Sequence, residues 1–202
     1  ERMTRICEVD ERLGYAVLEP GVTYKILNDH LKATKSRLWA DAAGSTPHAS
    51  VIGNALDKGR GLTPMADHFG SLCGMDVVLA DGSMLETGGG PTRGNAVRHT
   101  YKWGVGPCLD GLFAQSNLGI VVKACVWLMP EPECFDFAAF EYKAPPEKLG
   151  AFIDDLRELV MARAIRSHPH LANDFAMMCI LAQYPHELLQ GRRHLSEEAA
   201  AK

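Results

Sequence analysis

A short stretch in the first third of the chain carries residue types suited to binding an anion. In residues 49–55, Ala49, Ser50, Gly53 and Asn54 are small or carry a hydrogen-bonding side chain. Small side chains let backbone N–H groups approach a phosphate or pyrophosphate closely, and the Asn54 side chain can add a hydrogen bond. A Gly-Asn pair taken alone is more often an ordinary turn, so this interpretation needs support from elsewhere in the chain.

Two later stretches could lie beside the same ligand. Residues 74–82 predict a strand that ends in a hairpin turn at Asp81-Gly82. Residues 112–122 predict the end of a helix, a glycine turn and a buried strand. Each stretch is a weak signal alone, and only their combination and order are informative.

Three other groups of residues could do chemistry, but structural explanations are better. Asp67 and His68 could form a catalytic pair, yet we expect them to brace a loop by hydrogen bonds. His168 and His170 lack supporting Cys or carboxylate ligands, so we predict no metal site. Ser50 has no His or acid at the spacing of a hydrolase triad. No catalytic residue is therefore assigned.

The composition is that of an ordinary globular domain of 202 residues, with 47% hydrophobic and 23% charged residues. A net charge of −4 gives no electrostatic reason to expect nucleic acid or an anionic membrane as partner. No apolar run reaches the length of a membrane span. The six cysteines form no CxxC pair and are expected to be mostly buried, reduced thiols. We expect a cytoplasmic protein, with a periplasmic location as the alternative, because the sequence opens abruptly at Glu1 and we expect its true start to be missing.

The elements that must position these residues form an α+β pattern. We expect strands at residues 6–9, 15–18, 75–79, 83–87 and 120–128. A helix over residues 23–35 has Thr23 as its N-cap and Ile26, Leu27, His30 and Leu31 as its inward stripe. A short helix is expected over residues 108–114. The glycine-rich residues 42–64 should lie on one side of the sheet and face a cleft, and residues 87–95 should form a mobile loop.

The composition changes at residues 130–133, Pro-Glu-Pro-Glu, where a domain boundary is expected. After it, the patterns predict a strand over residues 135–142 and a helix over 146–163. A further strand is expected over 175–181, and the first turns of a helix over 196–202. We expect residues 134–202 to form a layer separate from residues 1–130.

In their order, the three stretches resemble the FAD-binding domain named after p-cresol methylhydroxylase, the PCMH-type domain. The resemblance is closest to the branch that holds p-cresol methylhydroxylase and vanillyl-alcohol oxidase. The residues that carry it are 18–23 (LEPGVT), 53–64 (GNALDKGRGLTP), 67–69 (DHF), 102–104 (KWG), 109–111 (LDG) and 127–130 (WLMP).

The resemblance implies an FAD cofactor and a mixed sheet with flanking helices. Residues 1–133 would be the C-terminal part of the PCMH-type domain, and residues 134–202 the beginning of a substrate cap domain. The resemblance implies cofactor contacts from nine residues: Ala49, Ser50, Gly53, Asn54, Gly59, Gly61, Gly119, Ile120 and Val121. The upstream phosphate loop of the family is absent from this sequence.

The function implied by the resemblance is transfer of a hydride from a 4-substituted phenol or related alcohol to the flavin N5. A 2-hydroxy-acid dehydrogenase is one alternative, and an inactive folding unit that does not bind FAD alone is another. The implied partners are a small aromatic or alcohol substrate, a cytochrome as electron acceptor and a homo-oligomer. Leu62 and Val105 stand where the branch has Tyr, and Ser45 stands where its oxidases place a carboxylate. Asp41 is the nearest acid.

Overall fold

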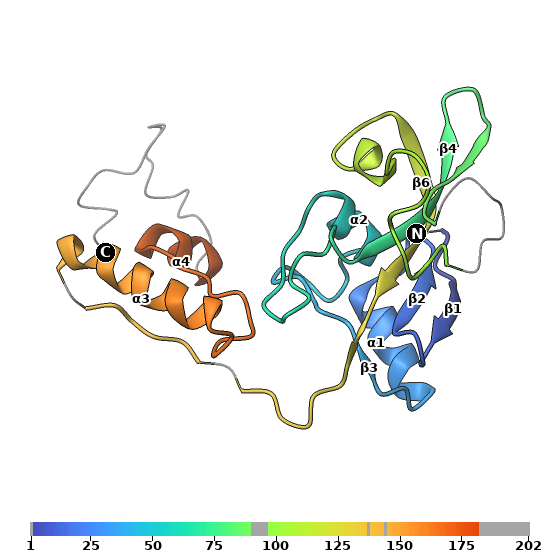
Figure 1. The fold of residues 1–202 in the computed structure, drawn as a ribbon. Helices are drawn as coiled ribbons and strands as arrows, with labels where there is room; N and C mark the ends of the chain where they lie inside the picture. The colour runs from blue at the N-terminus through green and yellow to red at the C-terminus, as the bar shows by residue number, and fades with distance from the viewer. Residues whose placement is uncertain (1, 90–96, 137, 144, 182–202) are drawn as a thin grey trace, which may run out of the picture. The chain divides into compact units, whose positions relative to one another are not determined.

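The computed structural model describes residues 2–89, 97–136, 138–143 and 145–181. They divide into two compact units, Glu1–His168 and Pro169–Lys202, and each is described by itself. The first unit contains a five-stranded sheet whose strand pairs are all antiparallel (Figure 1). In the order β1-β2-β6-β4-β5, the strands are Ile6–Asp10, Tyr15–Leu18, Gly119–Trp127, Leu72–Leu79 and Met84–Glu86. The α+β class expected from the sequence is confirmed.

Two long apolar strands, β4 and β6, form the centre of the sheet. They pair along their lengths, with Val77 opposite Val121. β2 pairs only with the C-terminal half of β6, as far as Leu18 opposite Ala124. Within the described residues, the Gly119 end of β6 therefore keeps one edge that no strand covers.

Helices α1 (Tyr24–Ala33) and α2 (Val51–Leu56) supply apolar side chains to one core with β2, β4 and β6. The fully buried members of this core include Ala16, Leu18, Leu27, Ile52, Leu72, Met75 and Val77. The short helix α2 is not among the helices expected from the sequence. The 3₁₀ helix η1 (Asp110–Phe113) lies within the predicted helix at residues 108–114 and adds Phe113 to the core.

Helix α1 begins as predicted, because Thr23 Oγ1 accepts a hydrogen bond from the Ile26 N–H at 3.2 Å. Leu27 and Leu31 are buried, as expected. Ile26 is 37% exposed, so its predicted inward position is wrong. Tyr24 is buried instead, one turn before Leu27, because the inward stripe starts at the first residue of the helix.

A second, smaller apolar cluster is formed by Tyr15, Val17 and Cys125, with Trp127 packed against it. The chain around His99 covers it: the Tyr15 and His99 rings lie 5.5 Å apart, and Trp127 Nε1 donates to the His99 carbonyl oxygen at 2.7 Å. Both faces of β2 are therefore buried.

Strands β3 (Leu38–Trp39) and β7 (Met129–Pro130) pair in a separate two-stranded sheet, and β7 follows β6 almost directly in the chain. The ring of Trp39 meets that of Phe135 edge-on, with centroids 5.3 Å apart. The ladder brings the exit of β6 next to the segment that follows α1. It thereby fixes the backbone just before Asp41.

Two elements after residue 133 differ from expectation. The strand predicted over residues 135–142 is wrong for the described residues there, because they pair with no strand and Phe140 is 88% exposed. Residues 175–181 belong to helix α4 (Asp174–Leu181), not to a strand. Asn173 Oδ1 caps this helix by accepting the Ala176 N–H at 2.9 Å, and Ala and Met favour helix.

The helix predicted over residues 146–163 is present as η2 (Pro146–Lys148) and α3 (Leu149–Met161), and no residue of either is buried. The helix start predicted at 196–202 lies outside the described residues, as does most of the predicted loop at 87–95. The domain boundary near residue 133 stays a prediction.

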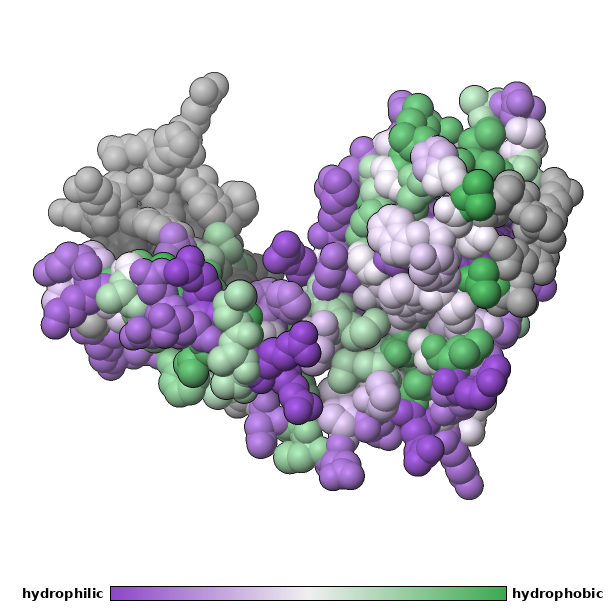
Figure 2. Space-filling model, in the orientation of Figure 1, coloured by the Kyte–Doolittle hydropathy of each residue, from purple (hydrophilic) through white to green (hydrophobic). Residues whose placement is uncertain are grey.

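The expectation that most cysteines are buried is wrong. Cys73 and Cys125 are buried, whereas the other four, Cys7, Cys108, Cys134 and Cys179, are exposed, and all six are free thiols. An apolar neighbour in sequence does not decide burial when the segment itself lies at the surface. Hydrophobic residues are scattered among hydrophilic ones on the face drawn in Figure 2. Among the described helices, none is long and apolar enough to cross a membrane.

Candidate functional site

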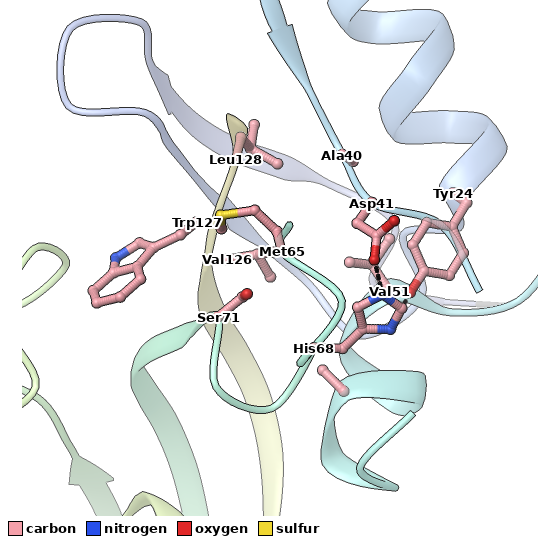
Figure 3. Close-up of a pocket in the computed structure, with 11 residues that line it drawn as sticks. Tyr24, Ala40, Asp41, Val51, Met65, His68, Ser71, Val126, Trp127 and Leu128 are labelled. Carbon is pink, nitrogen blue, oxygen red and sulfur yellow. Dashed lines mark hydrogen bonds and ion pairs between the residues drawn. The ribbon is translucent and has the colours of Figure 1, made fainter. Parts of the chain in front are cut away.

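Four side chains from separate segments meet in one hydrogen-bonded group, which we call the Asp41 cluster: Tyr24, Asp41, Asn54 and His68. Figure 3 shows three of them, Tyr24, Asp41 and His68. His68 Nε2 lies 2.9 Å from Asp41 Oδ2, and His68 Nδ1 lies 2.5 Å from Asn54 Oδ1. Tyr24 OH donates to Asn54 Oδ1 at 3.1 Å. The side chains of Asp41 and His68 are only 5% and 6% exposed, so water does not replace these bonds.

Each member of the Asp41 cluster is placed by a different element. Tyr24 is the first residue of α1, and Asp41 follows β3 by two residues. Asn54 lies on α2, and His68 lies between the Arg60–Asp67 bridge and β4. The cluster therefore ties together α1, the segment after β3, α2 and the segment before β4.

The electrostatics of the cluster follow from its burial. Burial alone would raise the pKa of Asp41, but hydrogen bonds and charge from His68, and the Thr63 N–H, hold it below its ordinary value. Burial, followed by the charge of Asp41, raises the pKa of Tyr24 to about 12. At neutral pH the cluster thus contains an ionised carboxylate and a neutral phenol.

Two glycines predicted to touch the cofactor lie against this cluster. A Cβ atom on Gly59 would come within 2.3 Å of the Asn54 side-chain amide, and one on Gly61 within 1.7 Å of Asp41 Oδ2. Both positions need glycine because the backbone passes directly over these side chains. Their contact with a cofactor stays a prediction.

A cleft of about 910 Å³ borders the Asp41 cluster. Its walls come from α1, the β3 segment and the glycine-rich stretch, which contributes Ala42, Ala43, Thr46, Pro47, Leu62 and Thr63. Tyr24 and Asp41 also line it, and they line the smaller pocket drawn in Figure 3 as well. The two ends of the glycine-rich stretch therefore face a cleft, while its middle forms α2.

The predicted pyrophosphate-binding stretch is the start of α2, and its hydrogen-bonding groups are largely in use. Ser50 Oγ accepts the Gly53 N–H at 2.8 Å and donates to the Pro20 carbonyl oxygen at 2.6 Å. The N–H groups of Val51 and Asn54 donate to backbone carbonyl oxygens, each at 3.0 Å. Gly53 is nevertheless exposed, and no partner is described for the Ile52 N–H.

Ala49 belongs to the same group, because its carbonyl oxygen accepts the Tyr24 N–H at 3.1 Å. The structure therefore gathers the predicted residues between positions 49 and 61 around α2 and the Asp41 cluster. None of them is among the residues that line the cleft.

The remaining predicted residues, Gly119, Ile120 and Val121, lie at the uncovered end of β6. A Cβ atom on Gly119 would come within 2.5 Å of Val77 Cγ1, so packing requires the glycine. Val121 is in the core, whereas Ile120 is 71% exposed. Among the described residues, no strand pairs with the second edge of β6 at this end.

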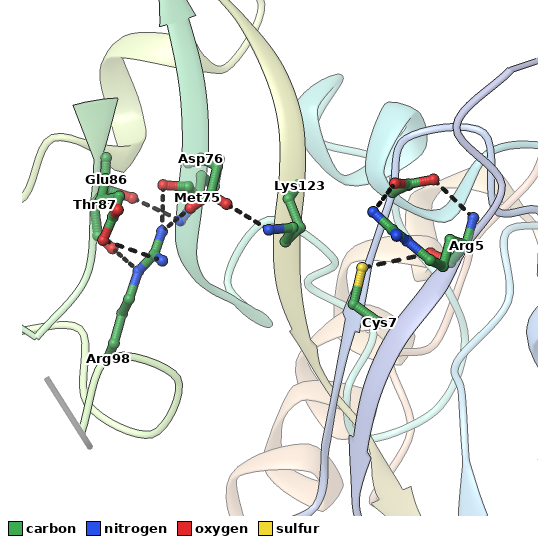
Figure 4. Close-up of polar contacts among 9 residues, drawn as sticks. Arg5, Cys7, Met75, Asp76, Glu86, Thr87, Arg98 and Lys123 are labelled. Carbon is green, nitrogen blue, oxygen red and sulfur yellow. Dashed lines mark hydrogen bonds and ion pairs between the residues drawn. The ribbon is translucent and has the colours of Figure 1, made fainter. Parts of the chain in front are cut away.

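A second polar network, which the sequence did not predict, joins Arg98 to side chains on β4, β5 and β6 (Figure 4). Arg98 forms an ion pair with Asp76, and it donates to the carbonyl oxygens of Thr87 at 2.9 Å and Met75 at 2.7 Å. Lys123 Nζ lies 2.9 Å from the other Asp76 oxygen. The sequence feature that could have predicted this network is a charged residue inside an otherwise apolar strand, as at Asp76 and Lys123.

The expectation that residues 67 and 68 brace a loop agrees with their contacts. Asp67 Oδ1 accepts the Gly70 N–H at 2.8 Å, and His68 joins the Asp41 cluster. His168 and His170 are exposed. Over the described part of the chain, no three His, Cys, Asp or Glu side chains gather as a metal site would require.

A family model described as an FAD binding domain matches residues 1–88. The 1'-carboxy-chondrochloren decarboxylase of Chondromyces crocatus is 38% identical over 201 residues, which cover 100% of this chain and 37% of that protein. The 4-cresol dehydrogenase [hydroxylating] flavoprotein subunit of Pseudomonas putida is 37% identical over 167 residues, or 82% of this chain and 32% of that protein. The chain thus spans about a third of the length of these relatives.

The fold is also similar to that of a solved structure. The crystal structure of p-cresol methylhydroxylase with substrate bound superposes with a TM-score of 0.74 at 29% sequence identity. The superposition covers 89% of this chain and 39% of that one.

Proposed function

Because this chain belongs to the PCMH-type family of FAD-binding flavoproteins, we propose that it is part of an FAD-dependent oxidoreductase. Residues 1–133 would complete the flavin-binding domain, and residues 134–202 would begin the substrate cap. The observation that carries the proposal is the match of the family model to residues 1–88, together with relatives that align with most of the chain.

Two places in the chain fit FAD. The exposed face of Gly53 at the start of α2 carries no side chain, so a phosphate oxygen could approach the backbone closely there. The uncovered edge of β6 at Gly119–Val121 suits backbone hydrogen bonds to the cofactor. Ser50 would shape the first place indirectly, because its hydroxyl fixes the first turn of α2.

FAD, when bound, supplies the acceptor for a hydride from the substrate. The residues of this chain would bind and orient both molecules. The cleft bordered by Leu62, Thr63 and the Ala42–Ala43 backbone is the place we propose for the substrate, because its wall is mainly apolar. Asp41 would not act as a free base there, since His68 and the Thr63 N–H already use both of its oxygens.

For the substrate we propose a 4-substituted phenol or a related alcohol, as the names of the relatives suggest. A flavoprotein subunit implies a second component, and we propose a cytochrome as the electron acceptor. A second candidate function is decarboxylation, because the relative that aligns over the whole chain is named a decarboxylase.

The test uses the protein purified from its complete reading frame and loaded with FAD. It is mixed anaerobically with 4-alkylphenols, carboxylated phenols and 2-hydroxy acids. Loss of the flavin absorption with a 4-alkylphenol supports the first proposal. Carbon dioxide release from a carboxylated phenol supports decarboxylation instead. Reduction by a 2-hydroxy acid alone would contradict both and favour a hydroxy-acid dehydrogenase.

A further inference from the structure

The cleft wall is held by a hydrogen bond from the Asp41 cluster. The Thr63 N–H donates to Asp41 Oδ1 at 3.3 Å, and Leu62 and Thr63 both line the cleft. Gly61 lies directly against the other Asp41 oxygen. The carboxylate thus contacts residues 61 and 63, on either side of Leu62. It thereby fixes the backbone from which the Leu62 side chain extends.

His68 decides how the carboxylate is oriented. Its Nε2 lies 2.9 Å from Asp41 Oδ2, and its Nδ1 lies 2.5 Å from Asn54 Oδ1. The Tyr24 hydroxyl, which donates to Asn54 Oδ1, also lies 3.3 Å from His68 Nδ1. Both ring nitrogens of His68 are therefore engaged inside the cluster, and this holds the ring in place against Asp41 Oδ2.

This arrangement uses both carboxylate oxygens in a fixed way. His68 holds Oδ2, which leaves Oδ1 directed at the Thr63 N–H. At 5% and 6% side-chain exposure, neither partner can turn to solvent to satisfy its hydrogen bonds. The pair therefore restricts the backbone of residues 61–63 more tightly than an exposed pair could.

We propose that Asp41 and His68 are positioning residues, which act as a buried hydrogen-bonded pair to fix Leu62 in the wall of the cleft. Leu62 then presents an apolar surface to whatever the cleft holds. This role rests on the proposed function only in taking the cleft as the substrate site. The positioning itself requires no cofactor.

The test is amide hydrogen exchange of the purified protein, without added FAD, in Asp41→Ala and Asp41→Asn variants. Loss of the acceptor in Asp41→Ala should speed exchange of the Thr63 amide about tenfold, the worth of one typical hydrogen bond. Asp41→Asn keeps an acceptor oxygen and should restore most of the protection. Asp29→Ala removes an exposed carboxylate that pairs with Lys25 beside the same cleft, and should leave Thr63 unchanged.

Exchange in β4 and β6 reports whether each variant is folded. Should Asp41→Ala unfold, His68→Gly with and without imidazole takes its place, and imidazole should restore the protection of Thr63. Equal exchange in Asp41→Ala, Asp41→Asn and wild type would overturn the proposal. A protein without flavin but with the predicted exchange would refute the proposed function alone.

Discussion

Gly61 lies so close to Asp41 that a Cβ atom at position 61 would come within 1.7 Å of the carboxylate oxygen Oδ2. Contacts within this chain therefore explain why position 61 is a glycine. It lets the backbone cross the Asp41 cluster, and the wall of the cleft follows directly after it.

We predict that Gly61→Ala destabilises the protein, because the new methyl group must displace Asp41 or the backbone. The expected loss is about 1–3 kcal/mol, the usual cost of overpacking a well-packed site. Urea unfolding at equilibrium measures it. Gly111→Ala is the matched control, since a Cβ atom there would meet nothing within 4 Å. Equal midpoints for the two variants would show that position 61 has room.

Ser50→Ala should loosen α2. Its hydroxyl caps the helix through the Gly53 N–H and also donates to the Pro20 carbonyl oxygen. Loss of an N-cap costs about 0.5–2 kcal/mol, and we expect a value near the top of that range because a second bond is lost with it. Ser45→Ala, in an exposed bend, is the control for thermal unfolding. A variant as stable as this control would mean that the cap contributes nothing.

The regular elements of the first half could be predicted because their signals are local. Thr23 caps α1, and the apolar runs of β4 and β6 mark the centre of the sheet. Helix α2 was missed because Gly53 and Asn54 suggested a turn. The Ser50 cap and the apolar residues Val51, Ile52 and Ala55 were its signal.

The Asp41 cluster could not be predicted, because its members are up to 44 residues apart and only the tertiary fold brings them together. The sequence resemblance directed attention to Gly59 and Gly61 as cofactor contacts. Their immediate neighbours within the chain are Asn54 and Asp41, and their contact with a cofactor stays a prediction. The two wrongly predicted strands, at residues 135–142 and 175–181, lie beyond residue 133. Few of the described side chains there are buried, so the spacing of apolar residues does not indicate which face of an element packs against a core.

Acid should weaken the protein partly through Asp76. Burial alone would raise the pKa of this carboxyl, but hydrogen bonds from Lys123 and Arg98 lower it. A carboxyl with a lowered pKa in the folded state contributes stability above its unfolded pKa of about 4, and this is lost as the pH falls through the folded value. We expect Asp76→Asn to cost about 1–3 kcal/mol at neutral pH.

The variant should also lose less stability than wild type between neutral pH and the acid range, as followed by urea unfolding at several pH values. Asp154→Asn removes an exposed carboxylate paired with Arg157 and serves as the control. Parallel pH profiles for Asp76→Asn and wild type would rule out the role given to Asp76.

Thiol labelling should separate the cysteines into two classes. Burial raises the pKa of Cys73 to about 11 and also raises the pKa of Cys125, so neither forms the reactive thiolate at neutral pH. We expect rapid labelling of the exposed Cys7, Cys108, Cys134 and Cys179, and labelling of the buried pair only in denaturant. Peptide mass spectrometry identifies the sites. Modification of Cys125 in the native protein at the rate of Cys7 would contradict the sheet packing.

The 202-residue chain alone should bind FAD weakly. Most N–H groups at the start of α2 already have partners within the chain, so few charge-assisted bonds to a pyrophosphate remain. Flavin fluorescence during a titration measures the affinity. Saturable binding below about 1 μM, near −8 kcal/mol, would show that these residues form a sufficient site.

The absorption spectrum of the protein purified from its complete reading frame tests the central claim most directly. It should be recorded as isolated, after incubation with FAD, and after acid precipitation, which separates covalent from dissociable flavin. We predict the visible absorption bands of a flavin in about one equivalent per chain, as expected of a tightly held cofactor. A folded protein that stays colourless after incubation with FAD would contradict the assignment of this chain to a working flavoenzyme.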